Sequence, residues 1–291
     1  MKDFKGKGVF ITGAASGIGF GLAQSFSEKG AKVAIADIRV EAAEEAAAKI
    51  RAAGGDAVAV QLDVGNPESW KAAADAAEAA IGPISVLCNN AGTSGAQAVV
   101  GVKPLDEMMP AEWELLTRVN FSGPFYGIQT FVPRFKKRGG EAHVVNTTSM
   151  AGIMPQYAGL PPAYVATKFG AVGLTEQLRL ELMDEFPNIG VSMLAPGTVA
   201  TDVRKSALQV ATYGDDVTPD GFKDGYAEFM EAAMSPYKVA QAVLKAVEEN
   251  RFYVFTHPEY KGMSDHFAAR IAAGWGESAD PTYTDPLPEP R

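Results

Sequence analysis

The chain has 291 residues, of which 47% are hydrophobic and 21% are charged, the proportions of an ordinary globular protein. Its formal net charge is −9, and its Lys and Arg residues form no stripe of the kind that binds nucleic acid. No apolar run approaches the roughly 18 residues that a membrane span requires. We therefore expect neither a nucleic-acid partner nor a membrane partner.

Cysteine usage and the N-terminal segment indicate the compartment. Cys88 is the one cysteine and stands in an apolar run, so we expect a core residue. The chain has no disulfide framework and no Cys/His spacing of a metal site. Residues 1–8 are too short and too polar to be a secretory signal. These features predict a cytoplasmic protein with no bound metal.

Short apolar runs alternate with helical patterns along the chain. Strands are expected at 9–11, 32–36, 57–62, 84–88, 143–146, 190–194 and 252–256. Helices are expected at 20–29, 41–53, 67–81, 110–137, 164–186 and 236–250, with a bend near Gly123 in the long helical region. This alternation is typical of a parallel sheet covered by helices on both faces. The sequence predicts one α/β domain over 1–291, a doubly wound sheet.

Two segments break the alternation. Residues 201–236 are polar with scattered aromatic and Met residues, and long irregular stretches in compact domains are often functional. Because this one follows a strand end, we expect a lid over the site. Residues 257–291 are expected to form a tail, with an extended Pro-rich end at 281–291.

The first strand is joined to the first helix by a glycine-rich loop. Residues 12–19 read Thr-Gly-Ala-Ala-Ser-Gly-Ile-Gly. Glycines there permit a tight turn and a close approach of the backbone to a pyrophosphate, and a helix N-terminus attracts phosphate. The loop predicts a dinucleotide site, although a purely structural turn is the alternative.

An acidic residue favours NAD over NADP. Asp37 follows the second strand, 18 residues after Gly19. A carboxylate there can accept hydrogen bonds from the ribose hydroxyls of NAD and would repel the extra phosphate of NADP. Arg39 could accommodate that phosphate, but the glycine loop carries no positive charge, so NAD is the expected cofactor.

Tyr164 and Lys168 are four residues apart in a helical pattern. Residues at this spacing lie on the same face of a helix. A nearby ammonium favours the phenolate form of a tyrosine and lowers its pKa, which would make the pair an acid–base group. Taken alone, the pair also suits an ordinary solvated helix face.

Seven motifs in order make the sequence similar to the short-chain dehydrogenase/reductase family over about residues 5–202. They are Thr12-Gly13-x-x-x-Gly17-Ile18-Gly19, Asp63-Val64, Asn89-Asn90-Ala91-Gly92, Asn120, Ser149, Tyr164-x-x-x-Lys168 and Pro196-Gly197-x-x-x-Thr201. The resemblance implies a single-domain Rossmann-like fold with about seven strands and a nicotinamide cofactor. It also implies homodimers or homotetramers that pack through the helices of Asn120 and Tyr164.

The resemblance implies a role for each motif. Catalysis would rest on Asn120 (carrying a water of a proton relay), Ser149 (binding the substrate oxygen), Tyr164 (acid–base) and Lys168 (lowering the pKa of Tyr164 and holding the nicotinamide ribose). The cofactor would be bound by Gly13, Ser16, Gly17, Ile18, Gly19, Asp37, Ile38, Asp63, Val64, Asn90, Ala91, Gly92, Tyr164, Lys168, Pro196, Gly197, Val199 and Thr201. Asp63 would bind the adenine amino group, and Val199 and Thr201 would position the carboxamide.

Some of these roles have rivals. The Asn89–Asn90 pair could serve mainly to tie strands together, and Asn120 could be a structural polar residue. Thr147 and Thr148 compete with Ser149 for the catalytic hydroxyl, and the family pattern selects Ser149.

The expected substrate is a bulky hydrophobic or aromatic alcohol or ketone. Candidate pocket residues, at 94–98, 150–160 and in the predicted lid, are largely apolar or aromatic, as small-molecule pockets usually are. The distance from Ser149 to Tyr164 is longer than is usual in the family, so the loop 150–163 is expected either to reshape the substrate pocket or to form a surface bulge. Segments around Phe20, Asp37 and 251–260 resemble bacterial dehydrogenases of lignin-type benzylic alcohols.

The sequence thus predicts an NAD(H)-dependent oxidoreductase that interconverts a secondary alcohol and a ketone. One alternative is a 3-oxoacyl-carrier-protein reductase, for which the expected basic docking residues are missing. The other is a non-catalytic nucleotide-binding regulator, which the complete Ser, Tyr, Lys and Asn set argues against.

Overall fold

The structure is a computed structural model that describes residues 1–95, 102–154, 160–201 and 233–277. Most of the predicted lid at 201–236 lies outside the described residues, as do parts of the segments 94–98 and 150–163. The Pro-rich end at 281–291 lies wholly outside them.

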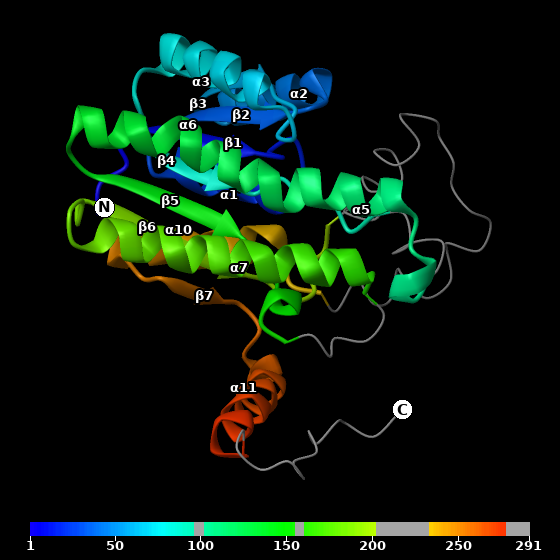
Figure 1. The fold of residues 1–291 in the computed structure, drawn as a ribbon. Coiled ribbons are helices and arrows are strands. Elements are labelled where there is room, and N and C mark those ends of the chain that lie inside the picture. The colour runs from blue at the N-terminus through cyan, green and yellow to red at the C-terminus, as the bar shows by residue number, and fades with distance from the viewer. Residues whose placement is uncertain (96–101, 155–159, 202–232, 278–291) are drawn as a thin grey trace.

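Seven parallel strands form one sheet in the order β3-β2-β1-β4-β5-β6-β7 (Figure 1). Their bounds are β1 Gly8–Thr12, β2 Lys32–Asp37, β3 Asp56–Gln61, β4 Ile84–Asn89, β5 Ala142–Thr147, β6 Ile189–Ala195 and β7 Tyr253–Phe255. The order reverses between β1 and β4, and in such sheets ligands bind beyond the carboxyl ends of the strands at this switch point. The predicted Rossmann-like doubly wound fold is confirmed.

Helices cover both faces of the sheet (Figure 1). The α-helices are α1 Gly17–Glu28, α2 Val40–Ala52, α3 Pro67–Ile81, α5 Pro110–Thr117, α6 Gly123–Arg138, α7 Pro162–Met183, α10 Pro236–Glu249 and α11 Lys261–Glu277. Short turns are η1 Leu105–Glu107, η2 Arg118–Ser122, η3 Met150–Gly152 and η4 Pro258–Tyr260.

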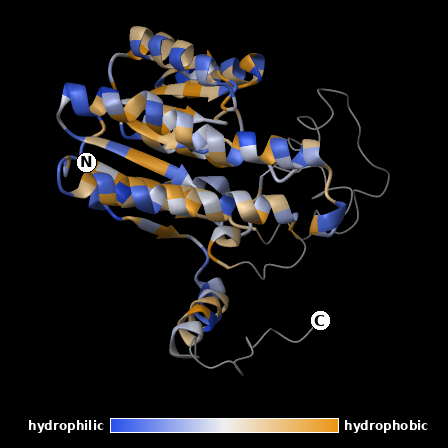
Figure 2. Cartoon of the chain, in the orientation of Figure 1, coloured by the Kyte–Doolittle hydropathy of each residue, from blue (hydrophilic) through white to orange (hydrophobic). Residues whose placement is uncertain are grey.

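The core has two halves, one on each face of the sheet. Side chains alternate along a strand, so Val9 and Ile11 of β1 join α1, α2 and α10, whereas Phe10 packs with α3, α6 and α7. All five residues of β1 are buried, as expected for a parallel strand covered on both sides. Figure 2 shows hydrophobic residues along the central strands and mixed colouring along the helices over them.

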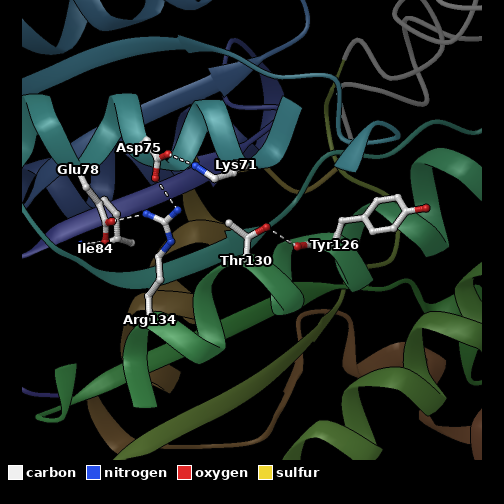
Figure 3. A network of polar contacts seen from close by, with 7 residues as sticks. All are labelled: Lys71, Asp75, Glu78, Ile84, Tyr126, Thr130 and Arg134. Atoms are coloured by element: carbon white, nitrogen blue, oxygen red, sulfur yellow. Dashed lines mark hydrogen bonds and ion pairs between the residues drawn. The ribbon is translucent and has the colours of Figure 1, made fainter. Parts of the chain in front are cut away.

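A surface network joins α3 to α6 (Figure 3). Arg134 of α6 pairs with Asp75 and Glu78 of α3, and Lys71 pairs with Asp75 at 2.7 Å. These hydrogen bonds, first from Lys71 and then from Arg134, lower the pKa of the Asp75 carboxyl. Helix α6 ends at Arg138 with three basic residues in its last turn, close to the helix end predicted at 137.

Three elements differ in detail from their predictions. The helical region predicted at 110–137 runs from Pro110 to Arg138, and the π-helical turn η2 interrupts it just before Gly123, where a bend was expected; there the Gly123 N–H donates to Arg118 O five residues back. The helix with Tyr164 begins at Pro162, because the fixed φ of proline suits a first helical position. The predicted tail contains η4 and the helix α11, which extends away from the sheet (Figure 1).

Within the described residues, no helix combines the length and apolar character needed to cross a membrane.

Candidate active site

The glycine loop between β1 and α1 leaves no room for a side chain at its glycine positions. Gly13 and Gly17 have φ of +62° and +55°, a conformation that glycine adopts without strain. A Cβ on Gly19 would lie 2.3 Å from Gly13 O, and one on Gly13 would lie 2.8 Å from the Ala91 Cα. Ser16 is the N-cap of α1, yet among the described residues its side chain makes no capping bond to the helix. The loop therefore presents open helix N–H groups, as an anion site requires.

Asp37 is held against this loop. Its Oδ2 accepts a hydrogen bond from the Ala15 N–H at 3.2 Å, and its Oδ1 accepts one from the Arg39 N–H at 3.1 Å. The Arg39 side chain also pairs with Oδ1, at 3.4 Å. Asp37 is 6% exposed, so the carboxylate has a fixed position at the end of β2. The guanidinium of Arg39 is turned toward this carboxylate.

Polar side chains tie the end of β1 to the end of β4. Thr12 Oγ1 accepts from the N–H groups of Asn90 and Ala91, both at 2.9 Å, and Asn90 Nδ2 donates to Thr12 O at 3.0 Å. Asn89 Nδ2 donates to Asn146 Oδ1 of β5 at 2.9 Å. The asparagine pair thus does tie strands together, and it also places Ala91 against Gly13 in the expected cofactor site.

A hollow lies beside the edge strand β3. Ile38 and Asp63 line it together with small residues of α3, so two residues expected to bind the cofactor share one cavity. Asp63 Oδ1 accepts from the Gly65 N–H at 2.9 Å, and Oδ2 pairs with Arg118 at 3.1 Å. Val64, the neighbour of Asp63, is buried against α3 and Gly123.

Asn120 lies in the π-helical turn η2, and such turns are frequent at functional sites. Its Oδ1 accepts from the Thr93 N–H at 2.9 Å, and its Nδ2 donates to Thr93 O at 2.8 Å and to Thr167 Oγ1 at 3.3 Å. The buried side chain therefore joins η2 to the segment after β4 and to α7. A Cβ on Gly92 would lie 3.2 Å from Asn120 Oδ1 and 3.4 Å from Lys168 Nζ, so Gly92 lies between these two groups.

The three candidate hydroxyls after β5 differ in their partners. Thr148 is buried, and its Oγ1 donates to Leu194 O of β6 at 2.9 Å. Thr147 Oγ1 lies 3.5 Å from Asn90 Oδ1. Ser149 Oγ accepts from the Ala151 N–H at 3.1 Å, which leaves its own proton available to a substrate oxygen. This geometry favours Ser149.

Lys168 is a buried ammonium beside Tyr164. Its Nζ donates to Thr147 O, the last residue of β5, at 3.1 Å and lies 5.7 Å from the centroid of the Tyr164 ring. Lys168 is 4% exposed, and burial lowers the pKa of its ammonium from 10.5 to about 8. The two side chains share one face of α7, as their spacing predicted.

The segment after β6 closes against the glycine loop. A Cβ on Gly17 would lie 3.1 Å from the Thr201 side chain. Pro196 O accepts from the Met150 N–H at 3.0 Å, which joins this segment to the turn after Ser149. Val199 pairs in a bridge with Met234. The residues predicted for the nicotinamide side are thereby brought next to both the glycine loop and the turn after Ser149.

Three further residues contribute to the site without a sequence signal. Thr93 and Thr167 hold Asn120, and His257 contacts the loop after β6. Each acts through contacts with residues far away in the chain, so no local pattern marks it. Among the described residues, no group of His, Cys, Asp or Glu side chains could hold a metal ion.

Comparison with known proteins supplies the family. A profile described as short chain dehydrogenase matches residues 7–211. The chain belongs to the short-chain dehydrogenase family. Short-chain dehydrogenases are oxidoreductases with a Rossmann-like fold, as the motif order indicated.

Several full-length relatives are similar to this short-chain dehydrogenase. A C alpha-dehydrogenase of Sphingobium sp. is 35% identical over 98% of this chain and 90% of its own. A CLA biosynthesis dehydrogenase/reductase from Lactiplantibacillus plantarum is 32% identical over 93% of this chain and 95% of its own. A short-chain dehydrogenase from Burkholderia phymatum, solved in complex with NAD, matches with 30% identity and a TM-score of 0.81 over 99% of this chain and 100% of its own.

Proposed function

We propose that this short-chain dehydrogenase interconverts a secondary alcohol and a ketone with NAD(H) as cofactor. The observation that carries the proposal is the position of Lys168, whose buried ammonium lies between Thr147 O and the Tyr164 ring. At neutral pH a group with a pKa of about 8 is mostly charged. A fixed positive charge beside a phenol suits proton transfer at a carbonyl oxygen.

Each residue of the site has one task in ketone reduction. A bound NADH would supply the hydride that reduces the carbonyl carbon. Tyr164 gives its phenolic proton to the carbonyl oxygen, and Ser149 donates a hydrogen bond to the same oxygen as negative charge develops there. Lys168 stabilises the phenolate that Tyr164 becomes, and Asn120 holds a water that returns a proton toward Lys168. Alcohol oxidation uses the same groups in reverse.

The cofactor preference rests on Asp37. Its carboxylate is fixed at the end of β2, beside the glycine loop, where it can accept hydrogen bonds from the adenosine ribose. A 2′-phosphate at that point would meet a buried negative charge. Ile38, Asp63 and Val64 would enclose the adenine, and the N-terminus of α1 would hold the pyrophosphate.

The substrate is proposed to be bulky and aromatic or otherwise hydrophobic. Beside Ser149, Met150 and Met154 pack with Ile153, Tyr260 and Met263 in an apolar cluster. This buried cluster makes the surroundings of Ser149 apolar, which favours an apolar substrate anchored by a few polar groups. The similarity to a C alpha-dehydrogenase of Sphingobium sp. supports benzylic alcohols and aryl ketones as the first compounds to test.

The experiment measures absorbance of the reduced nicotinamide with a panel of benzylic alcohols, aryl ketones and a 3-oxoacyl thioester. We expect turnover of at least one aryl ketone, with kcat/KM at least about tenfold higher for NADH than for NADPH. In Asp37→Asn that preference should shrink. A wild-type preference for NADPH would contradict the cofactor assignment, and turnover of the thioester alone would contradict the substrate class.

We also propose that the protein forms homodimers or homotetramers through α6 and α7, and that it acts in the cytoplasm. Phe125 on α6 and Leu180 on α7 are exposed, at 41% and 60%, and such apolar surface favours association. Light scattering on the purified protein should give the mass of two or four chains, and a monomer would contradict this proposal.

A further inference from the structure

His257 is a buried side chain that lies outside the family motifs. It follows β7 and precedes η4, 60 residues after the loop that it contacts. Its Nδ1 accepts a hydrogen bond from the Gly197 N–H at 3.0 Å, and its Nε2 lies 2.9 Å from Thr198 O. One imidazole ring thus holds two consecutive residues of the loop after β6.

These partners assign the tautomer of His257. A backbone N–H can only donate, so Nδ1 carries no hydrogen, and a carbonyl oxygen can only accept, so Nε2 carries the proton. The Thr256 hydroxyl lies 2.8 Å from Nδ1 and can donate to it as well. The neutral ring therefore satisfies both the donor of Gly197 and the acceptor of Thr198.

The ring also fixes the loop by packing. A Cβ on Gly197 would lie 2.7 Å from His257 Cγ and 2.5 Å from the Tyr260 ring, so the two rings lie directly against the Gly197 backbone. The ring centroids of His257 and Tyr260 are 5.9 Å apart. Tyr260 in turn packs against Met150 and Met154, which connects this contact to the turn after Ser149.

Other backbone hydrogen bonds also support the loop. The Met150 N–H donates to Pro196 O at 3.0 Å, and the Ala200 N–H donates to Met234 O at 2.9 Å. Thr198 O also accepts from the Met234 N–H at 3.3 Å. The Gly197 N–H is held by His257, so loss of the imidazole would release Gly197 while its neighbours in the loop stay attached.

We propose that His257 is a positioning residue for the nicotinamide end of the cofactor. It acts through Gly197 and Thr198, which precede Val199 and Thr201, the residues expected at the carboxamide. The inference rests on the proposed NAD(H) function. It predicts that His257 affects binding of the nicotinamide half of the cofactor and leaves the ADP-ribose half unaffected.

The test measures the Kd of NADH and of ADP-ribose by titration calorimetry. ADP-ribose contains the adenosine and pyrophosphate parts but lacks nicotinamide. For His257→Leu we expect the Kd of NADH to rise about tenfold, the effect of losing a buried hydrogen bond, with the Kd of ADP-ribose unchanged. His257→Asn can still accept from the Gly197 N–H, and His257→Gln can still donate to Thr198 O, so each should recover part of the affinity for NADH.

His143→Gln is the matched control. His143 is also buried, but it lies near the start of β5, where its Nε2 contacts Ser192 Oγ, and its variant should bind both ligands like the wild type. An equal loss of NADH and ADP-ribose affinity in His257→Leu would overturn the inference, because it would indicate a general structural defect. Unchanged NADH affinity would overturn it too. If the wild type binds neither ligand, the proposed function fails, and this inference with it.

Discussion

His143 and Lys168 are both buried basic side chains, and they lie at opposite ends of β5. Burial lowers both pKa values: that of His143 from 6.5 to about 3, with the N-terminal ammonium as a smaller cause, and that of Lys168 from 10.5 to about 8. His143 faces Ser192, whereas Lys168 lies beside Thr147 O, Tyr164 and Gly92.

The comparison shows that a shifted pKa does not by itself identify an active site. Structural burial perturbs ionisable groups as strongly as catalysis requires. At the amino end of β5, His143 is neutral at neutral pH, and its contact with Ser192 joins β5 to β6. At the carboxyl end the perturbed group remains mostly charged at neutral pH, next to a phenol and at the edge where parallel sheets bind ligands.

The largest effect on activity is expected from Lys168→Met. Loss of the ammonium removes the charge that stabilises the Tyr164 phenolate, so kcat should fall about 1,000-fold. His143→Gln should keep kcat close to that of the wild type. Steady-state kinetics of the proposed ketone reduction measures both. A kcat for Lys168→Met within a few-fold of wild type would remove the distinction between the two ends of β5.

Lys168 should also affect alkaline stability. Between about pH 8 and 10.5 the unfolded chain keeps this proton after the folded chain has lost it. The unfolded state then binds more protons, so the free energy of unfolding rises with pH in this window, by up to about 3 kcal/mol. Lys168→Met should lack this rise. Urea unfolding at several alkaline pH values would measure it, and identical pH dependence in both proteins would contradict the assigned shift.

Ser149→Ala and Thr148→Val separate a catalytic from a structural hydroxyl. Ser149→Ala should lower kcat about 100-fold, since one hydrogen-bond donor to the developing oxyanion is lost. Thr148→Val removes the bond to Leu194 O and should lower the free energy of unfolding by about 1–2 kcal/mol, with kcat almost unchanged. The opposite pattern, a larger loss of kcat in Thr148→Val, would show that the wrong hydroxyl has been chosen.

His143→Gln should alter stability in acid without altering catalysis. The folded state keeps His143 neutral down to about pH 3, whereas the unfolded chain protonates it below about 6.5. Protonation of the unfolded state lowers the free energy of unfolding as the pH falls, by about 2 kcal/mol between pH 6.5 and 5. The variant should lack this part of the acid sensitivity. Chemical unfolding at the two pH values would measure the difference. The same fall in the free energy of unfolding in His143→Gln as in the wild type would contradict the assigned pKa shift.

The smallest effect is expected from the exposed network of Figure 3. Arg134→Met removes the ion pairs with Asp75 and Glu78, far from the site. Surface ion pairs contribute little and are screened by salt. We expect a slightly lower Tm at low ionic strength, no difference from wild type in concentrated salt, and unchanged kcat. A decrease in Tm that is the same at all salt concentrations would indicate that packing of the Arg134 methylene groups matters more than its charge.

Much of the fold could be predicted because its signals are local. The strands of the sheet are short apolar runs. Asp37 at the end of β2 and Ser149 just after β5 lie at the carboxyl edge of the sheet, as expected. The helix boundaries at Pro67 and Pro236 follow from the position of proline in a first turn.

The remaining features depend on contacts between distant segments. The π-helical turn at Asn120 arises where its side chain bonds to Thr93 and Thr167, which no local periodicity reveals. Helix α11 lies where the sequence predicts only a tail, and its Phe267 packs against Phe169 of α7, about 100 residues earlier in the chain. His257 is a lone histidine whose importance comes from a loop 60 residues earlier.

The most direct test of the account is the rate of hydride transfer in Tyr164→Phe, followed in a single turnover with NADH and an aryl ketone that the wild type reduces. Phenylalanine keeps the ring beside Lys168 and lacks only the hydroxyl. The account predicts a rate about 100- to 10,000-fold below that of the wild type, with a far smaller change in the Kd for NADH. A Tyr164→Phe rate within a few-fold of the wild type would contradict it.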